Sequence, residues 1–287
     1  MHLDLSHIYF YSDIDGTLGI AGEPIPTRNI EAVKQFINWG GHFGVATGRW
    51  ISELYEFLQE IPVNLPCIVN NGGSIYDYNC DNFLLNRTLP DTAPLYFQEI
   101  QNDYPLMDFY AVNQDDCYYC HRPGVSPLFQ KDFDTHPKAE FETLSGPFVK
   151  FFFLTESIHV QQIVSELGVR KYPDVQFIQS STTSFDMVPV DCNKGSALLK
   201  VCEMLEVPVS NTVFIGDNYN DKEIFQAAGF SAGVASTPKE LHPLCDIVMG
   251  NCMAGAVAEL LEAVEKLTLF PMQIRLSPRQ NKSRIAG

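Results

Sequence analysis

The stretch SDIDGTL, residues 12–18, follows four residues that favour a β-strand, Ile8-Tyr9-Phe10-Tyr11. It places two carboxylates, Asp13 and Asp15, two positions apart where that strand is expected to end. Because a strand directs residues i and i+2 to the same face, the two side chains are predicted to project together, and Gly16 then permits a sharp turn. Two like charges at that separation repel each other unless a cation lies between them or one keeps its proton. The stretch therefore predicts a metal site, an acid–base role, or both.

The composition narrows the classes of function. A chain of 287 residues is long enough for two domains, and its 45% of apolar residues can form well-packed cores. The formal net charge of −16 argues against nucleic-acid binding, which requires a basic surface. It also means that an anionic substrate must be attracted by local positive charge, because the overall field of the protein opposes it.

Three features of the sequence indicate the cellular compartment of the protein. The N-terminal sequence MHLDLSHIYF lacks a basic region followed by an apolar core and a cleavage site, so we do not expect secretion. No window approaches the roughly 20 apolar residues of a membrane span, and we expect no membrane partner. The eight cysteines are scattered without the spacing of a disulfide framework, which is typical of free thiols in a reducing compartment. We therefore expect a cytoplasmic protein.

One cysteine pattern allows two interpretations. Cys117-Tyr-Tyr-Cys120-His121 has the spacing of a c-type haem attachment site. That interpretation requires export to a compartment where haem is attached, and a zinc site usually requires four ligands. The surrounding residues 109–122 also resemble two strands around a polar turn at 114–116. We favour the strand.

The order of predicted elements indicates the fold class. Strands at 8–13, 42–47 and 67–70 alternate with helices at 27–39 and 51–58. This alternation favours a parallel sheet with helices on both faces. The parallel pattern resumes late in the chain, with helix 194–205, strand 212–215, helix 221–228, short strands near 233–235 and 246–248, and helix 255–267.

The middle of the chain interrupts this alternation of strands and helices and is predicted to be an α+β insertion. Its expected elements are a helix at 91–104, strands near 107–120, a long loop at 122–147, a strand at 148–154, a helix at 158–167, and a strand pair at 175–180 and 184–188.

Four polar clusters lie at predicted strand ends or at the helix starts beside them, where open α/β sheets bind ligands. They are Asp13 with Asp15, Thr47 in VATGR, Lys194 in DCNKG, and Asp217, Asn220 and Asp221 in GDNYND. Each alone has an ordinary explanation as a strand exit, a solvated helix start or a turn. A calcium loop, the other interpretation of DIDG, requires a glutamate at its twelfth position, where this chain has Pro24.

In this order, the four clusters resemble the motifs of the haloacid dehalogenase superfamily: DxDGT, a Ser or Thr ending the second strand, a lysine, and GDxxND. NNGGSIYD (70–77) is similar to a segment of the Cof-type phosphatases, which carry a large cap of class IIB, and SFDMVPVDCNKG (184–195) resembles the last cap strand of that group. The resemblance extends from Ile8 to about Leu267. VASTP (234–238) departs from the Asn-Ala stretch usual in the group.

The resemblance implies a fold and a division into domains. The fold is α/β, with a Rossmann-like parallel sheet, helices on both faces and an inserted α+β cap domain. We predict a core at residues 1–89 and 190–270, a cap at 90–189 and a polar tail at 271–287.

The resemblance also implies a Mg²⁺-dependent phosphatase that hydrolyses a small phosphorylated metabolite, such as a sugar phosphate, through an aspartyl-phosphate intermediate. In this family pattern Asp13 is the nucleophile and Asp15 the general acid and base. The metal ligands would be Asp13, the backbone carbonyl of Asp15, and Asp217.

The remaining motif residues would bind the substrate phosphate. The resemblance assigns this role to Thr47, Gly48, Lys194 and Asn220. Asn220 would contact either the phosphate or the nucleophile, and Asp221 would support the site by orienting either Lys194 or a metal-bound water. A further point charge on Lys194 and a hydrogen bond from Thr47 would offset the repulsion between a carboxylate and a phosphate dianion.

Arg49 and Asn71 lie near the same expected site mouth, where substrate contact and a solvated loop are both open interpretations. Two other functions also stay open. A sugar phosphomutase would need a second, arginine-rich phosphate clamp, and the insertion contains only Arg122 and Arg170. A non-catalytic phosphate sensor on the same fold would be expected to lack the nucleophile or a metal acid. The sequence does not indicate the oligomeric state or the identity of the ester.

Overall fold

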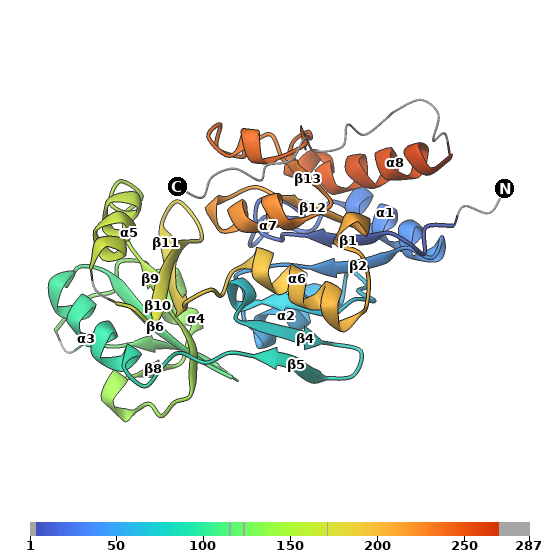
Figure 1. Cartoon of the computed structure of the whole chain (residues 1–287). Helices are drawn as coiled ribbons and strands as arrows, with labels where there is room; N and C mark the ends of the chain where they lie inside the picture. Colours follow the sequence, from blue (N-terminus) through green and yellow to red (C-terminus); the bar gives the residue numbers. More distant parts are fainter. Residues whose placement is uncertain (1–3, 115, 123, 171, 270–287) are drawn as a thin grey trace, which may run out of the picture.

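The computed structural model describes residues 4–114, 116–122, 124–170 and 172–269. It consists of two parts side by side, an α/β core and an inserted α+β cap (Figure 1). The predicted fold class is confirmed.

The core is built on a five-stranded parallel sheet with the order β14-β13-β12-β1-β2. Its strands are β1 (Tyr9–Ser12), β2 (His42–Val45), β12 (Thr212–Gly216), β13 (Phe230–Gly233) and β14 (Ile247–Val248). In the register of β1 and β12, Ser12 lies opposite Ile215. The carboxyl ends of the two central strands therefore meet at one edge, which brings the first and fourth sequence motifs together.

The period-two alternation of the strands explains why both faces of the sheet carry helices. Phe10 packs into a cluster with residues of α1 and α8, whereas the adjacent Tyr11 packs into a cluster with residues of α6 and α7. The helices of the core are α1 (Thr27–Asn38), α2 (Ile51–Leu58), α6 (Lys194–Met204), α7 (Lys222–Ala227) and α8 (Ala256–Leu269).

A small antiparallel sheet extends the core at the edge beyond β2. It contains β3 (Cys67–Val69), β4 (Ser74–Asp77) and β5 (Asn82–Asn86). A single parallel bridge between Ala46 and Ile68 connects it to the main sheet. The strand predicted at 67–70 is thus present, and it continues into a hairpin that leads to the cap.

The cap contains a six-stranded sheet with the order β10-β11-β9-β6-β7-β8. Its strands are β6 (Asp108–Asn113), β7 (Cys117–Cys120), β8 (Lys138–Ala139), β9 (Phe148–Leu154), β10 (Val175–Gln179) and β11 (Ser184–Pro189). Helices α3 (Ala93–Asp103) and α5 (Val160–Val169) cover one face through a cluster of buried aromatic and aliphatic side chains. On the other face, Trp50 of the core packs against a cap cluster that includes Tyr110 and Val112.

Two segments differ from the sequence prediction. The expected loop at 122–147 contains the short helix α4 (Gln130–Thr135) and strand β8. The buried carboxylate of Asp108 accepts hydrogen bonds from the backbone N–H groups of Leu128 and Phe129, which fixes the chain just before α4. Strand β13 ends at Gly233 rather than beginning there, because the Thr237 hydroxyl accepts from the Val234 N–H and starts a turn.

Cys117-Tyr-Tyr-Cys120 forms strand β7, as the strand interpretation predicted. All eight cysteines of the chain are free. Within the part of the chain that the structure describes, no helix is long and apolar enough to cross a membrane.

Candidate active site

The turn after β1 places the first motif against the fourth. The Asp13 N–H still pairs with the Ile215 carbonyl at 2.9 Å, after which the chain turns. Gly16 has a φ of 90°, and a Cβ at this position would lie 2.4 Å from Asp217 Oδ2. A side chain at Gly16 would therefore be strained and would also displace the Asp217 carboxylate.

Lys194 forms the buried centre of the site. Its Nζ lies 2.7 Å from Asp13 Oδ1 and 2.7 Å from Asp221 Oδ1. The Lys194 side chain is fully buried, and Asp13 is only 4% exposed. Lys194 begins α6, whose start is fixed by a capping box between Asn193 and Ser196. The helix thus holds the ammonium group between two carboxylates of other motifs.

The carboxylates outnumber the ammonium group, and their pKa values reflect this. Burial raises the pKa of Asp13 well above its usual value; Lys194 opposes the shift, and Asp221 and Asp217 add to it. Burial also raises the pKa of Asp217 to about 7, with further repulsion from Asp221. In this environment the ionised forms need an additional positive charge.

The donor set fits a hard divalent cation. Carboxylate oxygens of Asp13, Asp217 and Asp221 all lie within 4.8 Å of one another, and oxygen ligands are the ones that Mg²⁺ prefers. Asp221 is already engaged, since Oδ1 accepts from Lys194 and Oδ2 accepts from the N–H groups of Asp217 and Asn218 at 2.8 and 3.1 Å. Asp13 and Asp217 are therefore the better ligand candidates, and Asp221 positions Lys194.

Thr17 was not assigned a role from the sequence, yet it contacts this centre. Its hydroxyl donates to Asp217 Oδ1 at 2.9 Å and holds that carboxylate beside the turn. Its place in the DIDGT motif was the available signal.

Thr47 and Asn220 lie on the side of the site that faces β3. Thr47 is buried, and its backbone is fixed by its N–H donating to Ile68 and its carbonyl accepting from Asn71. The Asn220 amide donates to Asn71 Oδ1 at 3.0 Å. The buried Asn220 Oδ1 has no partner among the described residues, so a bound group with a donor could satisfy it.

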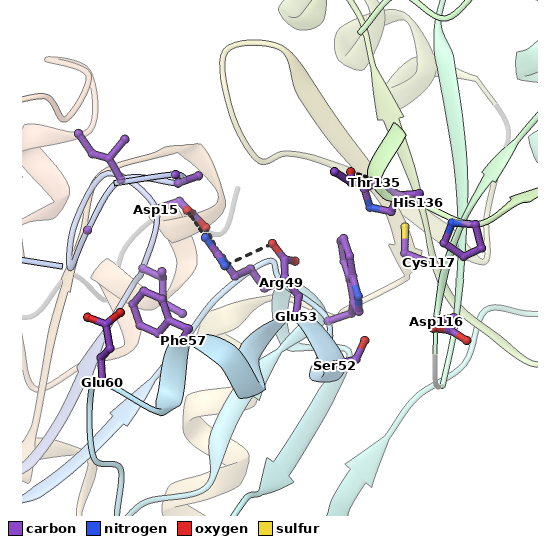
Figure 2. A pocket seen from close by; sticks show the side chains of 17 residues that line it. Asp15, Arg49, Ser52, Glu53, Phe57, Glu60, Asp116, Cys117, Thr135 and His136 are labelled. Carbon is purple, nitrogen blue, oxygen red and sulfur yellow. Dashed lines mark hydrogen bonds and ion pairs between the residues drawn. The ribbon is translucent and has the colours of Figure 1, made fainter. Parts of the chain in front are cut away.

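Asp15 has a different environment from Asp13. Its two carboxylate oxygens accept from Arg49 Nε and Nη2 at 2.8 and 2.7 Å, and its side chain is 44% exposed. Arg49 Nη1 also lies 3.3 Å from Glu53 Oε1, so that the guanidinium lies between two carboxylates (Figure 2). The repulsion predicted between Asp13 and Asp15 is thus relieved by two separate cations, Lys194 and Arg49.

Residues of the cap reach the same site, and the sequence analysis did not identify them. Lys150 Nζ donates to the Gly48 carbonyl at 2.8 Å and to Asp186 Oδ1 at 2.9 Å. The Asn71 amide donates to Asp186 Oδ2 at 2.5 Å and to Ser180 Oγ at 2.9 Å. We call Lys150, Asp186, Asn71 and the Gly48 carbonyl the cap–core network. The signal in the sequence was one charged residue in each of two apolar strands, FVKFFFL and SFDMVP.

A cavity of about 800 Å³ lies between core and cap, and it is lined at the first motif by Ile14 and Asp15 but not by Asp13. Asp15, Arg49 and Glu53 line it from the core, and Asp116 and His136 line it from the cap (Figure 2). A space of this volume can hold a small organic molecule.

Comparison with known proteins agrees with this geometry. Residues 10–261 match the family of haloacid dehalogenase-like hydrolases. The chain belongs to this family, as the order of its four motifs predicted, and it is a hydrolase of the phosphatase type.

Two relatives and one solved structure illustrate the similarity. The pyridoxal phosphate phosphatase YbhA of Escherichia coli is 23% identical over 264 residues, covering 87% of this chain and 95% of the relative. The 5-amino-6-(5-phospho-D-ribitylamino)uracil phosphatase YcsE of Bacillus subtilis is 23% identical over 249 residues, covering 87% and 92%. The structure of BT4131, a subclass IIB sugar phosphatase, superposes with a TM-score of 0.75 at 17% identity, covering 90% and 98% of the two chains.

Proposed function

We propose that this protein is a Mg²⁺-dependent phosphatase that hydrolyses a small phosphorylated metabolite through an aspartyl-phosphate on Asp13. The observation that carries the proposal is the Lys194 ammonium held at 2.7 Å from both Asp13 and Asp221 in a buried acidic site. The adjoining cavity is large enough for a small ester, and two relatives are named as phosphatases of small phosphorylated compounds.

In the first step, an Asp13 oxygen attacks phosphorus while the bond from phosphorus to the ester oxygen breaks. Protonated Asp15 gives its proton to the leaving alcohol. In the second step, the Asp15 carboxylate takes a proton from water, the resulting hydroxide attacks phosphorus, and the bond to Asp13 breaks. The products are the alcohol and inorganic phosphate, and Asp13 is regenerated.

The other motif residues would hold the phosphoryl group. Lys194 is positioned to offset the negative charge shared by Asp13 and the phosphate. Thr47 and Gly48 follow the end of β2. The Asn220 amide nitrogen donates one hydrogen to Asn71 and has a second to offer. We propose the Thr47 side chain, the backbone at Gly48 and this amide nitrogen as phosphate contacts. Asp221 keeps Lys194 in place through the 2.7 Å ion pair.

We propose Asp13, Asp217 and the backbone carbonyl of Asp15 as Mg²⁺ ligands. When bound, the ion would supply positive charge that neutralises the phosphate oxygens and orients them for attack. The raised pKa values of Asp13 and Asp217 support a cation at this position, because burial and mutual repulsion otherwise oppose their ionised forms.

Arg49 would control where the Asp15 carboxylate points. The bidentate contact directs it to the wall of the cavity, where the alcohol part of an ester would lie. Arg49 would therefore place the Asp15 carboxylate beside the alcohol part, and Asp15 would give up at least one of the two contacts when it carries the proton for the leaving alcohol. We further propose a cytoplasmic setting, which the free thiols support, and a cap domain spanning residues 90–189.

The proposal is tested by phosphate release from a panel of phosphorylated metabolites. We expect turnover with Mg²⁺ and none in excess chelator. Asp13→Asn, an isosteric change that removes the nucleophile and leaves Lys194 paired with Asp221, should abolish turnover and lower the unfolding temperature while thermal unfolding stays cooperative. Full turnover of Asp13→Asn would refute the aspartyl-phosphate, and full turnover in chelator would refute the metal.

A further inference from the structure

We infer that the cavity between core and cap favours phosphomonoesters whose alcohol part is neutral or cationic, and selects against those that carry a second anionic group. This substrate class rests on the proposed phosphatase function and narrows it.

The walls of the cavity are acidic. Four carboxylates line it, and they belong to Asp15, Glu53, Glu60 and Asp116. Among the described lining residues, Arg49 is the one Lys or Arg side chain. The carboxylates come from both sides, with Asp15, Glu53 and Glu60 on the core and Asp116 on the cap (Figure 2).

Arg49 offers a second anion little net positive charge while it keeps its present contacts, because two carboxylates already pair with its guanidinium. Nε and Nη2 donate to the two oxygens of Asp15, and Nη1 pairs with Glu53. All three nitrogens of the guanidinium are therefore engaged by carboxylates. Burial disfavours the charge on Arg49, but its hydrogen bonds with Asp15 and the negative charges of Asp15, Glu53 and Asp13 together outweigh this effect and raise its pKa.

Other cations near the cavity do not cancel the excess of negative charge on its walls. Lys150 and Lys194 are buried and paired with Asp186 and with Asp13 and Asp221. Lys131 of α4 lies at the rim, where its Nζ is 3.8 Å from the position a Cβ would take on Gly22. His136 adds a positive charge only in its protonated form.

An anionic group on the alcohol part would thus meet four carboxylates, with one paired arginine inside the cavity and Lys131 at its rim. Repulsion of this kind selects substrates by penalising the wrong ones. The net charge of −16 acts in the same direction at longer range. Sugar phosphomutases must hold a second phosphate group, so this cavity is also unsuited to that reaction.

Three synthetic esters of nearly equal size test the charge preference. They are 4-(aminomethyl)phenyl, 4-(hydroxymethyl)phenyl and 4-(carboxymethyl)phenyl phosphate, which carry a cationic, neutral and anionic group. Binding is measured by calorimetry with Mg²⁺ and the full-length Asp13→Asn variant, and phosphate release is measured with the wild-type protein. We expect the carboxymethyl ester to bind about tenfold more weakly than the hydroxymethyl ester, and the aminomethyl ester to bind at least as well.

Matched variants separate the effect of the charges in the cavity from the effect of the overall charge of the protein. Asp116 is exposed at the turn before β7, so Asp116→Lys in the same background should shift the affinity ratio toward the carboxymethyl ester by about tenfold. Glu53→Gln should shift it in the same direction. Glu31→Gln removes one charge from an exposed position of α1 outside the cavity and should leave the ratio unchanged.

The outcomes distinguish the two proposals. Equal binding of the carboxymethyl and hydroxymethyl esters, an unchanged ratio in Asp116→Lys, or no binding of any ester would overturn the charge selection. Binding in the expected order without phosphate release from wild-type protein would refute the phosphatase function and leave the selection in place.

Discussion

Lys194 is a buried cation whose stability depends on its two partners. Burial alone would lower the pKa of its ammonium group, but Asp13 and Asp221 raise it above the ordinary value. Removing one partner of a buried ion pair leaves an uncompensated charge, which is strongly destabilising. The same side chain therefore organises the site and constrains which of its neighbours can be changed without unfolding the protein.

Asp217 makes the stability of the metal-free protein depend on pH. Its pKa rises from 3.8 to about 7, because burial and Asp221 disfavour the carboxylate. Between these values the native protein keeps a proton that the unfolded chain has lost, so the free energy of unfolding falls as pH rises from about 4 to about 7. The fall attributable to this residue is at most about 4 kcal/mol.

Urea unfolding in chelator at several pH values measures this effect. Asp217→Asn should show a flatter pH dependence than wild type. Added Mg²⁺ should stabilise the wild type more at about pH 8 than at about pH 5, because protons compete with the metal for carboxylates. Identical pH profiles of the two proteins in chelator would contradict the assignment.

Asp15 should matter most for esters with a poor leaving group. Asp15→Asn cannot donate a proton, so the rate of enzyme phosphorylation by an alkyl phosphate should fall by about 10² to 10⁴. The phenolate of an aryl phosphate can leave without full protonation, so the rate of enzyme phosphorylation by an aryl phosphate should fall less. Rapid-quench measurements of the first step give both rates, and equal losses for the two ester types would exclude Asp15 as the general acid.

At the scale of elements, strands β9 and β11 each present one charged residue to the core. Phe151 and Phe153 of β9 face the helices of the cap, so Lys150 points the other way by the period-two rule. The same rule places Asp186 of β11 beside it, and the two side chains are 3% and 1% exposed. The cap–core network is therefore built from the polar positions of two otherwise apolar strands.

Breaking this network should destabilise the protein. Lys150→Met leaves Asp186 buried without its ion partner, and removal of one partner of a buried pair costs about 3 to 5 kcal/mol. Lys150→Met/Asp186→Asn should be less destabilised than the sum of the two single variants. Lys200→Met, which removes an exposed partner of Glu203, is the control and should change little. The free energies of unfolding of the four proteins, measured in urea, form a double-mutant cycle. If the two single changes add up to the double change, Lys150 and Asp186 are not coupled.

The sequence predicted the core elements better than the cap, for a physical reason. In the core, local alternation of strands and helices and the polar strand ends were enough to bring Asp13, Asp217 and Lys194 together. In the cap, strand order depends on pairing between distant segments, such as β9 between β6 and β11. The engagement of Asp15 by Arg49 was also hidden, because it depends on side-chain directions in two separate turns.

For the molecule as a whole, the core and cap each have their own apolar interior. One cap cluster contains only residues 89–187, and the two core clusters contain none from that range. The two connections between the parts lie close together, since Arg87 Nη2 donates to the Val190 carbonyl at 3.3 Å. Apart from the network at Lys150, the parts also contact through Gln161 and Tyr219 at 3.1 Å. Separate interiors and adjacent connections favour a core that folds without the cap.

Replacing residues 90–189 with a short glycine–serine linker should therefore give a folded core that keeps the four motifs but discriminates poorly between esters. The contact between Arg87 and Val190 means that only a few linker residues are needed. Loss of the cap removes Asp116 and His136 from the cavity and opens the site to water, so the kcat/KM values for glucose 6-phosphate, pyridoxal phosphate and p-nitrophenyl phosphate should converge to within about tenfold. Circular dichroism checks the fold, and a second version with Trp50→Gln guards against aggregation through the exposed indole. Unchanged ratios of kcat/KM in a well-folded capless protein would show that the cap does not select the substrate.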